Sequence, residues 1–125
     1  MASKYDGMFK LSQAVDENGN ALALPPGKAF VLVLRSESDR HYALSLRLGN
    51  SLRSDMVVNP SSDSSSRDGV HIGEVMSTMM MPPEAIFRVE TFLKNYLPKA
   101  TNVYFEDDNE TLSFEGQGKI SFTRE

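Results

Sequence analysis

Apolar and polar residues alternate with a period of two in several segments, which is typical of half-buried β-strands. In the clearest segment, residues 42–48, Tyr42, Leu44, Leu46 and Leu48 fall on one face. Residues 9–12 alternate in the same way, and residues 52–58 do so less regularly. Residues 30–34 are continuously apolar and include two β-branched valines. That run predicts a central strand covered on both faces.

Three shorter apolar pairs near the C-terminus predict an antiparallel meander. The two connections between them contain Asp107-Asp108-Asn109 and Gly116-Gln117-Gly118, which favour tight turns. Both connections are too short for a parallel crossover. The predicted strands carry Val103 and Phe105, Leu112 and Phe114, and Ile120 and Phe122.

One helix is predicted between these two groups of strands, over residues 83–97. Pro82-Pro83 precedes it, and proline is favoured at a first helical position because its missing N–H has no partner there in any case. Pro98 ends it, since the residue before a proline avoids helical angles. Its apolar stripe consists of Ile86, Val89, Leu93, Tyr96 and Leu97, with Phe92 beside it.

We expect this stripe to lie in the concave face of the sheet and to form the centre of the core. Four aliphatic side chains at about 1.5–3 kcal/mol each make the stripe the main source of the helix's stability. The pairs Glu84–Arg88 and Glu90–Lys94 have the i,i+4 spacing of surface ion pairs, which contribute little.

The length of 125 residues predicts one domain, residues 1–125. Residues 59–69 are rich in serine and contain no large apolar side chain, so we expect a flexible surface loop there. The longest apolar run has six residues, too few for a transmembrane segment. The first residues do not resemble a secretory signal, which predicts a cytoplasmic protein and leaves peripheral or secretory-route association open.

The charge distribution narrows the expected partners. Lys and Arg number 13 against 17 Asp and Glu, giving a net charge of −4, and no segment concentrates the basic residues. Nucleic acid and anionic membranes attract clustered Lys and Arg, so both are poor candidate partners. We expect a monomer with an unknown protein partner and no nucleic acid.

Candidate chemistry is sparse. The chain has no cysteine, and two histidines cannot form a three-histidine metal site. Residues 107–110 resemble a calcium loop only in composition, and no serine lies in a nucleophile-elbow motif. Four clustered methionines could bind copper(I), but packing in the core before the helix is the favoured interpretation: Met76, Met79, Met80 and Met81. We therefore assign no catalytic, cofactor-binding or metal-binding residue and expect no cofactor.

A set of short motifs surrounds the helix. It consists of Thr78 with Met79 or Met80, Pro83-Glu84, Glu90, Phe92-Leu93, Tyr104, Leu112, and Phe122 with Arg124. In this order the motifs resemble the META-domain (HslJ-like) family, most strongly between about residues 70 and 124. Upstream, Gly7, Phe9 and Leu11 are similar to the family's opening Gly-x-Trp-x-Leu. The family's cysteine is missing, and Gly49-Asn50 is the nearest remnant of its Gly-Cys-Asn motif.

The resemblance implies an α+β fold, in which a curved, half-barrel-like antiparallel sheet of about seven or eight strands wraps around one helix. It implies no established reaction. The chain is most similar to the small kinetoplastid members associated with metacyclic stages and virulence. We therefore expect a non-enzymatic, virulence-associated interaction module linked to secretion or stress response. The alternative is a carrier of an apolar ligand or lipid in a cavity between sheet and helix.

Overall fold

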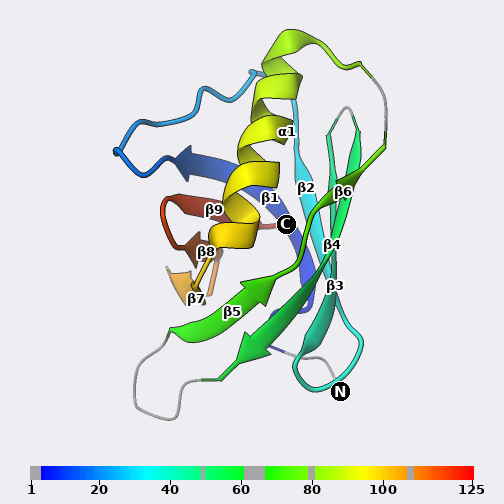
Figure 1. Ribbon diagram of the computed structural model, residues 1–125, viewed down its shortest axis with the longest axis vertical. Helices are drawn as coiled ribbons and strands as arrows, with labels where there is room; N and C mark the ends of the chain where they lie inside the picture. Colours follow the sequence, from blue (N-terminus) through cyan, green and yellow to red (C-terminus); the bar gives the residue numbers. More distant parts are fainter. Residues whose placement is uncertain (1–3, 49, 61–66, 79–80, 107–108) are drawn as a thin grey trace.

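The computed structural model describes residues 4–48, 50–60, 67–78, 81–106 and 109–125 (Figure 1). Within these residues the chain forms nine strands, one α-helix and one 3-10 turn. In chain order they are β1 (Gly7–Val15), β2 (Val31–Ser36), β3 (His41–Arg47), β4 (Ser51–Asn59), β5 (Asp68–Ile72), β6 (Met76–Ser77), α1 (Glu84–Tyr96), η1 (Leu97–Lys99), β7 (Asn102–Glu106), β8 (Thr111–Glu115) and β9 (Lys119–Arg124).

The strands form one curved antiparallel sheet whose two ends meet. The order is β3-β2-β1-β9-β8-β7-β5-β4-β6, and β3 also pairs with β4, which closes the ring. The predicted α+β class with a curved sheet and one helix is therefore confirmed, as is the C-terminal meander β7-β8-β9. The strand that stands last in this order, β6, has only two residues and pairs with β4 at Leu52 and Arg53.

The inner face of the ring carries the alternating apolar side chains, and Tyr42, Leu44 and Leu46 all point into the core. The prediction that β2 is covered on both faces is wrong. Leu32 and Leu34 are buried, whereas Val31 and Val33 are only half-buried. Their face is the outside of the ring, which the helix cannot cover because it packs against the inside.

The helix packs its predicted stripe against the inside of the ring (Figure 1). Val89, Leu93 and Leu97 are fully buried and Ile86 nearly so. The α-helix ends at Tyr96, and η1 continues the chain through Pro98. Pro83 serves as the N-cap, one position before the first helical residue.

The β8–β9 hairpin approaches the end of η1 so closely that its turn requires glycine. A Cβ atom on Gly116 would lie 2.3 Å from the carbonyl oxygen of Lys99, and one on Gly118 would lie 2.3 Å from that of Val15. No side chain fits at such a distance. This turn therefore holds the meander against both the helix terminus and β1.

The predicted loop over residues 59–69 is shorter than expected. Asn59 ends β4, and Asp68 and Gly69 begin β5, where they pair with β7. Asp68 is buried because its side chain accepts a hydrogen bond from Tyr5. The serine-rich centre, residues 61–66, lies outside the described residues. No described helix combines the length and apolar character that crossing a membrane requires.

Candidate functional site

A groove of about 310 Å³ runs between α1 and the segment formed by β6 and the β3–β4 turn. The α1 side contributes one face of the helix, and the opposite side contributes the turn and the end of β6. The lining residues are Asn50, Ser77, Thr78, Met81, Phe87, Glu90, Thr91, Lys94 and Asn95. We call this hollow the α1–β6 groove.

The floor of the groove is a buried hydrogen-bond network centred on Glu90, which is only 3% exposed. The backbone N–H of Asn50 donates to Oε2 of Glu90 at 2.9 Å, and its side-chain Nδ2 donates to Oε1 at 2.7 Å. The hydroxyl of Thr78 donates to Oδ1 of Asn50 at 2.8 Å. Asn50 therefore joins three separate segments, because it binds Glu90 on the helix and Thr78 after β6.

The network explains how a carboxylate can be buried in this position. Burial of a charge is costly unless hydrogen bonds compensate it, and here both oxygens of Glu90 receive a donor from Asn50. The predicted surface ion pair between Glu90 and Lys94 is therefore wrong. Lys94 instead donates to the hydroxyl of Ser77 at 3.3 Å, across the groove.

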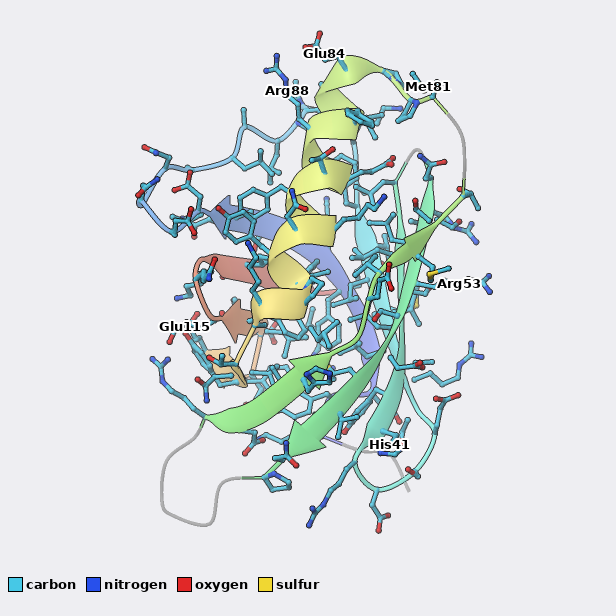
Figure 2. The ribbon with its side chains drawn as sticks, in the orientation of Figure 1. His41, Arg53, Met81, Glu84, Arg88 and Glu115 are labelled. Carbon is cyan, nitrogen blue, oxygen red and sulfur yellow. The ribbon has the colours of Figure 1, made fainter. Side chains whose placement is uncertain are left out.

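The rim of the groove is apolar and open to solvent. Met81 is 93% exposed and Phe87 is 51% exposed. Figure 2 shows Met81 beside the start of the helix, with Arg88 on the other side of the helix in this view. The prediction that the methionine cluster packs in the core is therefore wrong for Met81 and also for Met76, which is 66% exposed. Met79 and Met80 lie outside the described residues.

Most of the other residues that carry the family resemblance lie away from the groove. Leu93, Leu112 and Phe122 are fully buried in the core. Pro83 caps the helix, Glu84 pairs with Arg88 at 2.8 Å on its exposed side, and Phe92 stacks on Tyr96 with ring centroids 4.3 Å apart. These positions stabilise the fold. Thr78 and Glu90 are the motif residues that reach the groove.

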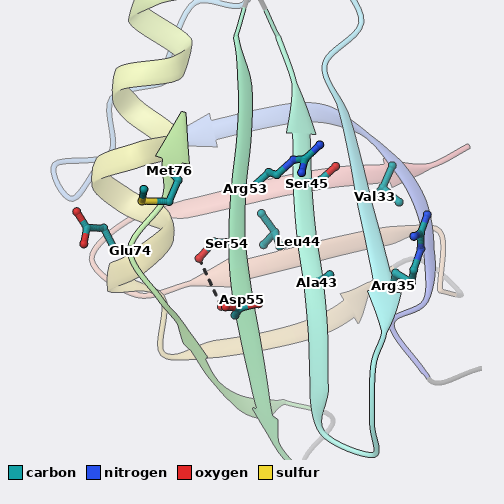
Figure 3. A pocket seen from close by; sticks show the side chains of 10 residues that line it. All are labelled: Val33, Arg35, Ala43, Leu44, Ser45, Arg53, Ser54, Asp55, Glu74 and Met76. Carbon is teal, nitrogen blue, oxygen red and sulfur yellow. Dashed lines mark hydrogen bonds between the residues drawn. The ribbon is translucent and has the colours of Figure 1, made fainter. Parts of the chain in front are cut away.

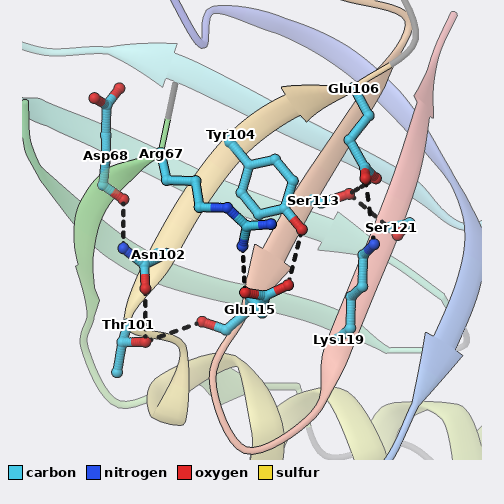
Figure 4. A network of polar contacts seen from close by, with 10 residues as sticks. All are labelled: Arg67, Asp68, Thr101, Asn102, Tyr104, Glu106, Ser113, Glu115, Lys119 and Ser121. Atoms are coloured by element: carbon cyan, nitrogen blue, oxygen red, sulfur yellow. Dashed lines mark hydrogen bonds and ion pairs between the residues drawn. The ribbon is translucent and has the colours of Figure 1, made fainter. Parts of the chain in front are cut away.

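Tyr104 lies on the outer face of the meander, in a separate polar network (Figure 4). Its hydroxyl donates to Oε2 of Glu115 at 2.9 Å, and the guanidinium of Arg67 covers its ring at 4.2 Å. Burial raises the pKa of Tyr104, and the hydrogen bond to Glu115 adds to the effect. The phenol therefore stays protonated at neutral pH and acts as a hydrogen-bond donor.

The same network contains a serine and a carboxylate. Ser113 donates to Oε2 of Glu106 at 2.7 Å, and this bond lowers the pKa of Glu106, with a smaller contribution from Lys119. Glu106 is therefore ionised and accepts hydrogen bonds from Ser113 and Lys119. The Ser113 hydroxyl also lies 3.2 Å from that of Ser121. No histidine lies in the network, and the described residues include no group of three or more His, Cys, Asp or Glu that could hold a metal ion.

Sequence reasoning placed Glu90 on the surface in an ion pair with Lys94 and gave no role to Phe87. One available signal was the helical position of Glu90, four residues after Ile86 and three before Leu93. A charged residue at that spacing belongs to the apolar stripe and needs a buried partner. The identity of that partner, Asn50, depends on how the β3–β4 turn approaches the helix.

The sequence matches no protein-family model and no curated protein. Among solved structures, it is similar to one described as the NMR structure of the protein from Burkholderia xenovorans. The TM-score is 0.68 and the identity 17%, over 96% of this chain and 82% of the other. At this identity the match shows that the two chains share a fold.

Proposed function

We propose that this chain is a META-domain (HslJ-like) interaction module that binds a partner protein in the α1–β6 groove. The observation that carries the proposal is the network of Asn50, Thr78 and Glu90 on the floor of the groove. Thr78 and Glu90 belong to the motifs that carry the family resemblance, and both bind Asn50, which lies in the nearest remnant of a family motif that the chain lacks. Their mutual contact supports the resemblance, because unrelated matches need not meet in space.

The groove favours an extended protein segment with an apolar side chain next to a carboxylate. Met81 and Phe87 offer exposed apolar surface at one end, and Lys94 provides a cation on the same helix face. An apolar anchor with a charge at its border is a common arrangement at protein interfaces.

The biological role that we propose follows the resemblance: virulence-associated, linked to secretion or stress response, and without catalysis. Deleting the gene should reduce infectivity or secretion in the source organism. Unchanged infectivity and secretion would contradict this role. The proposed binding in the groove is tested by a separate experiment.

Affinity purification from the source cells tests the groove, with the Phe87→Glu variant used as bait beside the unaltered protein. We expect at least one partner to be depleted about tenfold, since a charge in an apolar contact costs more than about 1.4 kcal/mol. Ala23→Glu is the matched control, because it adds the same charge at an exposed apolar residue in the loop between β1 and β2, outside the groove lining. A direct pull-down with the purified partner must reproduce the difference. Equal recovery with both variants would rule out the groove as the docking site.

The alternative function is a carrier of an apolar ligand or lipid. The space between sheet and helix holds the side chains of the core, among them Leu93 and Phe122, and both are fully buried. A ligand would therefore lie in the groove, against Met81 and Phe87. Native mass spectrometry of the purified protein should reveal a copurified apolar ligand if the carrier function holds. A ligand-free spectrum together with a Phe87-dependent partner would support the interaction module instead.

A further inference from the structure

Four basic side chains from four different strands gather on the outer face of the sheet. Neighbouring strands lie about 4.8 Å apart, and alternate residues on a strand lie about 7 Å apart. Lys10 and Arg47 both stand opposite Val31, so they lie two strands apart in one row. The four form a patch roughly 15 Å across: Lys10 on β1, Arg35 on β2, Arg47 on β3 and Arg53 on β4. We call this surface the β1–β4 outer face.

These four cations are exposed, and none of them takes part in an ion pair recorded between described residues. Those ion pairs use the bases Lys4, Arg67, Arg88 and Lys119. Two acids, Asp55 and Glu74, line the hollow beside Arg53. Two more acids lie at the β1 border, since Asp6 accepts a hydrogen bond from the backbone N–H of Ser36 and the backbone N–H of Glu125 donates to Met8. On the four strands themselves, four bases stand against one acid, Asp55, so the centre of the surface is positive although the whole chain has a net charge of −4.

Apolar side chains accompany the cations on the same face. Figure 3 shows Val33, Ala43 and Ser45 between Arg35 and Arg53, in an open hollow of about 460 Å³. Met8 stands opposite Val33 on one side, and Met76 stands opposite Arg53 on the other. These two methionines are 51% and 66% exposed. Flexible apolar tips therefore flank the central row of the basic patch.

This combination favours an anionic membrane surface over other polyanions. Single-stranded nucleic acids bind through aromatic stacking as well as charge, and no phenylalanine, tyrosine or tryptophan lies among the outward-facing positions described for β1–β4. A lipid bilayer needs neither stacking partners nor a deep pocket. Its headgroups accept the cations, and its interface accepts unbranched apolar side chains such as methionine.

We propose that the β1–β4 outer face binds the surface of membranes that contain anionic phospholipid. The cations contact the headgroups, and Met8 and Met76 enter the interfacial region at either side. This surface borders the α1–β6 groove at β6, where Arg53 and Met76 share a hollow with Ser77 and Thr78. In the sequence the basic residues are dispersed, which predicts that anionic membranes are poor partners. The proposal revises that prediction, because strand pairing brings basic residues from four strands together.

Vesicle co-sedimentation tests the proposal, using phosphatidylcholine alone and phosphatidylcholine with 30% phosphatidylserine, a composition that we choose to make the surface strongly negative. We expect binding to the anionic vesicles only, and weaker binding at higher salt. Each basic residue near an anionic surface contributes about fivefold to the partition coefficient. Arg47→Gln/Arg53→Gln should therefore bind roughly 30-fold more weakly. The control Arg88→Gln/Lys99→Gln removes the same charge from the helix side and should change binding by less than about threefold.

Two further measurements distinguish binding to a membrane from binding to soluble polyanions. Met8→Gln/Met76→Gln should weaken vesicle binding several-fold, while leaving any binding of a glutamate-rich peptide or a single-stranded oligonucleotide unchanged. The proposal is overturned if anionic and neutral vesicles bind equally, or if the arginine variant matches its control. It is also overturned if the peptide or oligonucleotide binds through the arginines while anionic vesicles bind no better than neutral ones. None of these results depends on the protein partner of the groove.

Discussion

At the scale of single residues, Glu90 links the helix to the β3–β4 turn and, through Asn50, to the end of β6. The carboxylate receives two donors from one residue, and the same residue accepts a hydrogen bond from Thr78. A buried polar network of this kind stabilises one arrangement of its segments, because any other arrangement leaves donors without acceptors. The network therefore defines the width of the groove as well as its floor.

We predict that Glu90→Ala destabilises the protein by roughly 2–4 kcal/mol, because two donors of Asn50 lose their charged acceptor in a buried site. The matched control is Glu84→Ala, which removes an exposed, ion-paired carboxylate from the same helix and should cost less than about 1 kcal/mol. Urea unfolding of both variants measures the difference. Similar midpoints would show that the Glu90 network does not contribute to stability.

Tyr5 is a second buried polar residue with a defined partner. Its hydroxyl donates to Oδ2 of Asp68 on β5 and lies 3.3 Å from the carbonyl oxygen of Val103 on β7. Burial raises the pKa of Tyr5 far above its ordinary value near 10, and the hydrogen bond to Asp68 and its charge raise it further. In the native protein the phenol therefore stays neutral at pH values where the unfolded chain loses that proton.

This difference predicts alkaline destabilisation. Below pH 10 the contribution of Tyr5 is fully present, and above pH 10 the native state binds more protons than the unfolded state. Stability should then fall by about 1.4 kcal/mol per pH unit from this residue alone. Tyr5→Phe should be less stable at pH 7 by about 1–2 kcal/mol and should show a shallower decline above pH 10. Parallel stability curves for the two proteins between pH 9 and 12 would contradict the prediction.

At the scale of elements, α1 is held by packing. Its buried stripe faces Phe114 and Phe122, whose rings meet edge-to-face with centroids 5.9 Å apart. The ion pair of Glu84 with Arg88 lies on the opposite, exposed side, where solvent screens it. The apolar contacts therefore decide where the helix sits.

Leu93→Ala should destabilise the protein by about 2–5 kcal/mol, through lost transfer energy and a residual cavity. Arg88→Ala should cost well under about 1 kcal/mol, because exposed ion pairs contribute little. Urea titrations of the two variants, performed side by side, measure the contrast. Equal midpoint shifts would mean that the stripe is not the main stabiliser of the helix.

At the scale of the whole molecule, neighbouring strands of the ring differ in how many residues they pair. The β3–β4 pairing extends over seven residue pairs, from His41–Val57 to Arg47–Ser51. The β5–β7 pairing has only two, Asp68–Val103 and Gly69–Asn102. One further backbone bond joins Val70 to Thr101 at 3.0 Å, and Tyr5 bridges the same two strands. The β5–β7 seam is therefore the weakest link in the ring.

We predict that the ring opens locally at this seam before it unfolds globally. Native-state hydrogen exchange should show the amide of Val70, which donates across the seam, exchanging faster than amides that bridge β3 and β4. Tyr5→Phe should accelerate exchange at Val70 and leave the β3–β4 amides at their original rates, apart from any change in global stability. Uniform protection around the ring would contradict this picture.

The amino-acid sequence by itself determined the local elements. The stripe from Ile86 to Leu97 and the three C-terminal strands follow from periodicity, which each segment carries within its own residues. The sequence did not reveal that Glu90 is buried, that Asn50 completes its hydrogen bonds, or that Arg47 and Arg53 share a basic surface. These features depend on which strands pair, in which register, and on which turn approaches the helix. Such choices are made by contacts between distant segments, so only the tertiary structure could decide them.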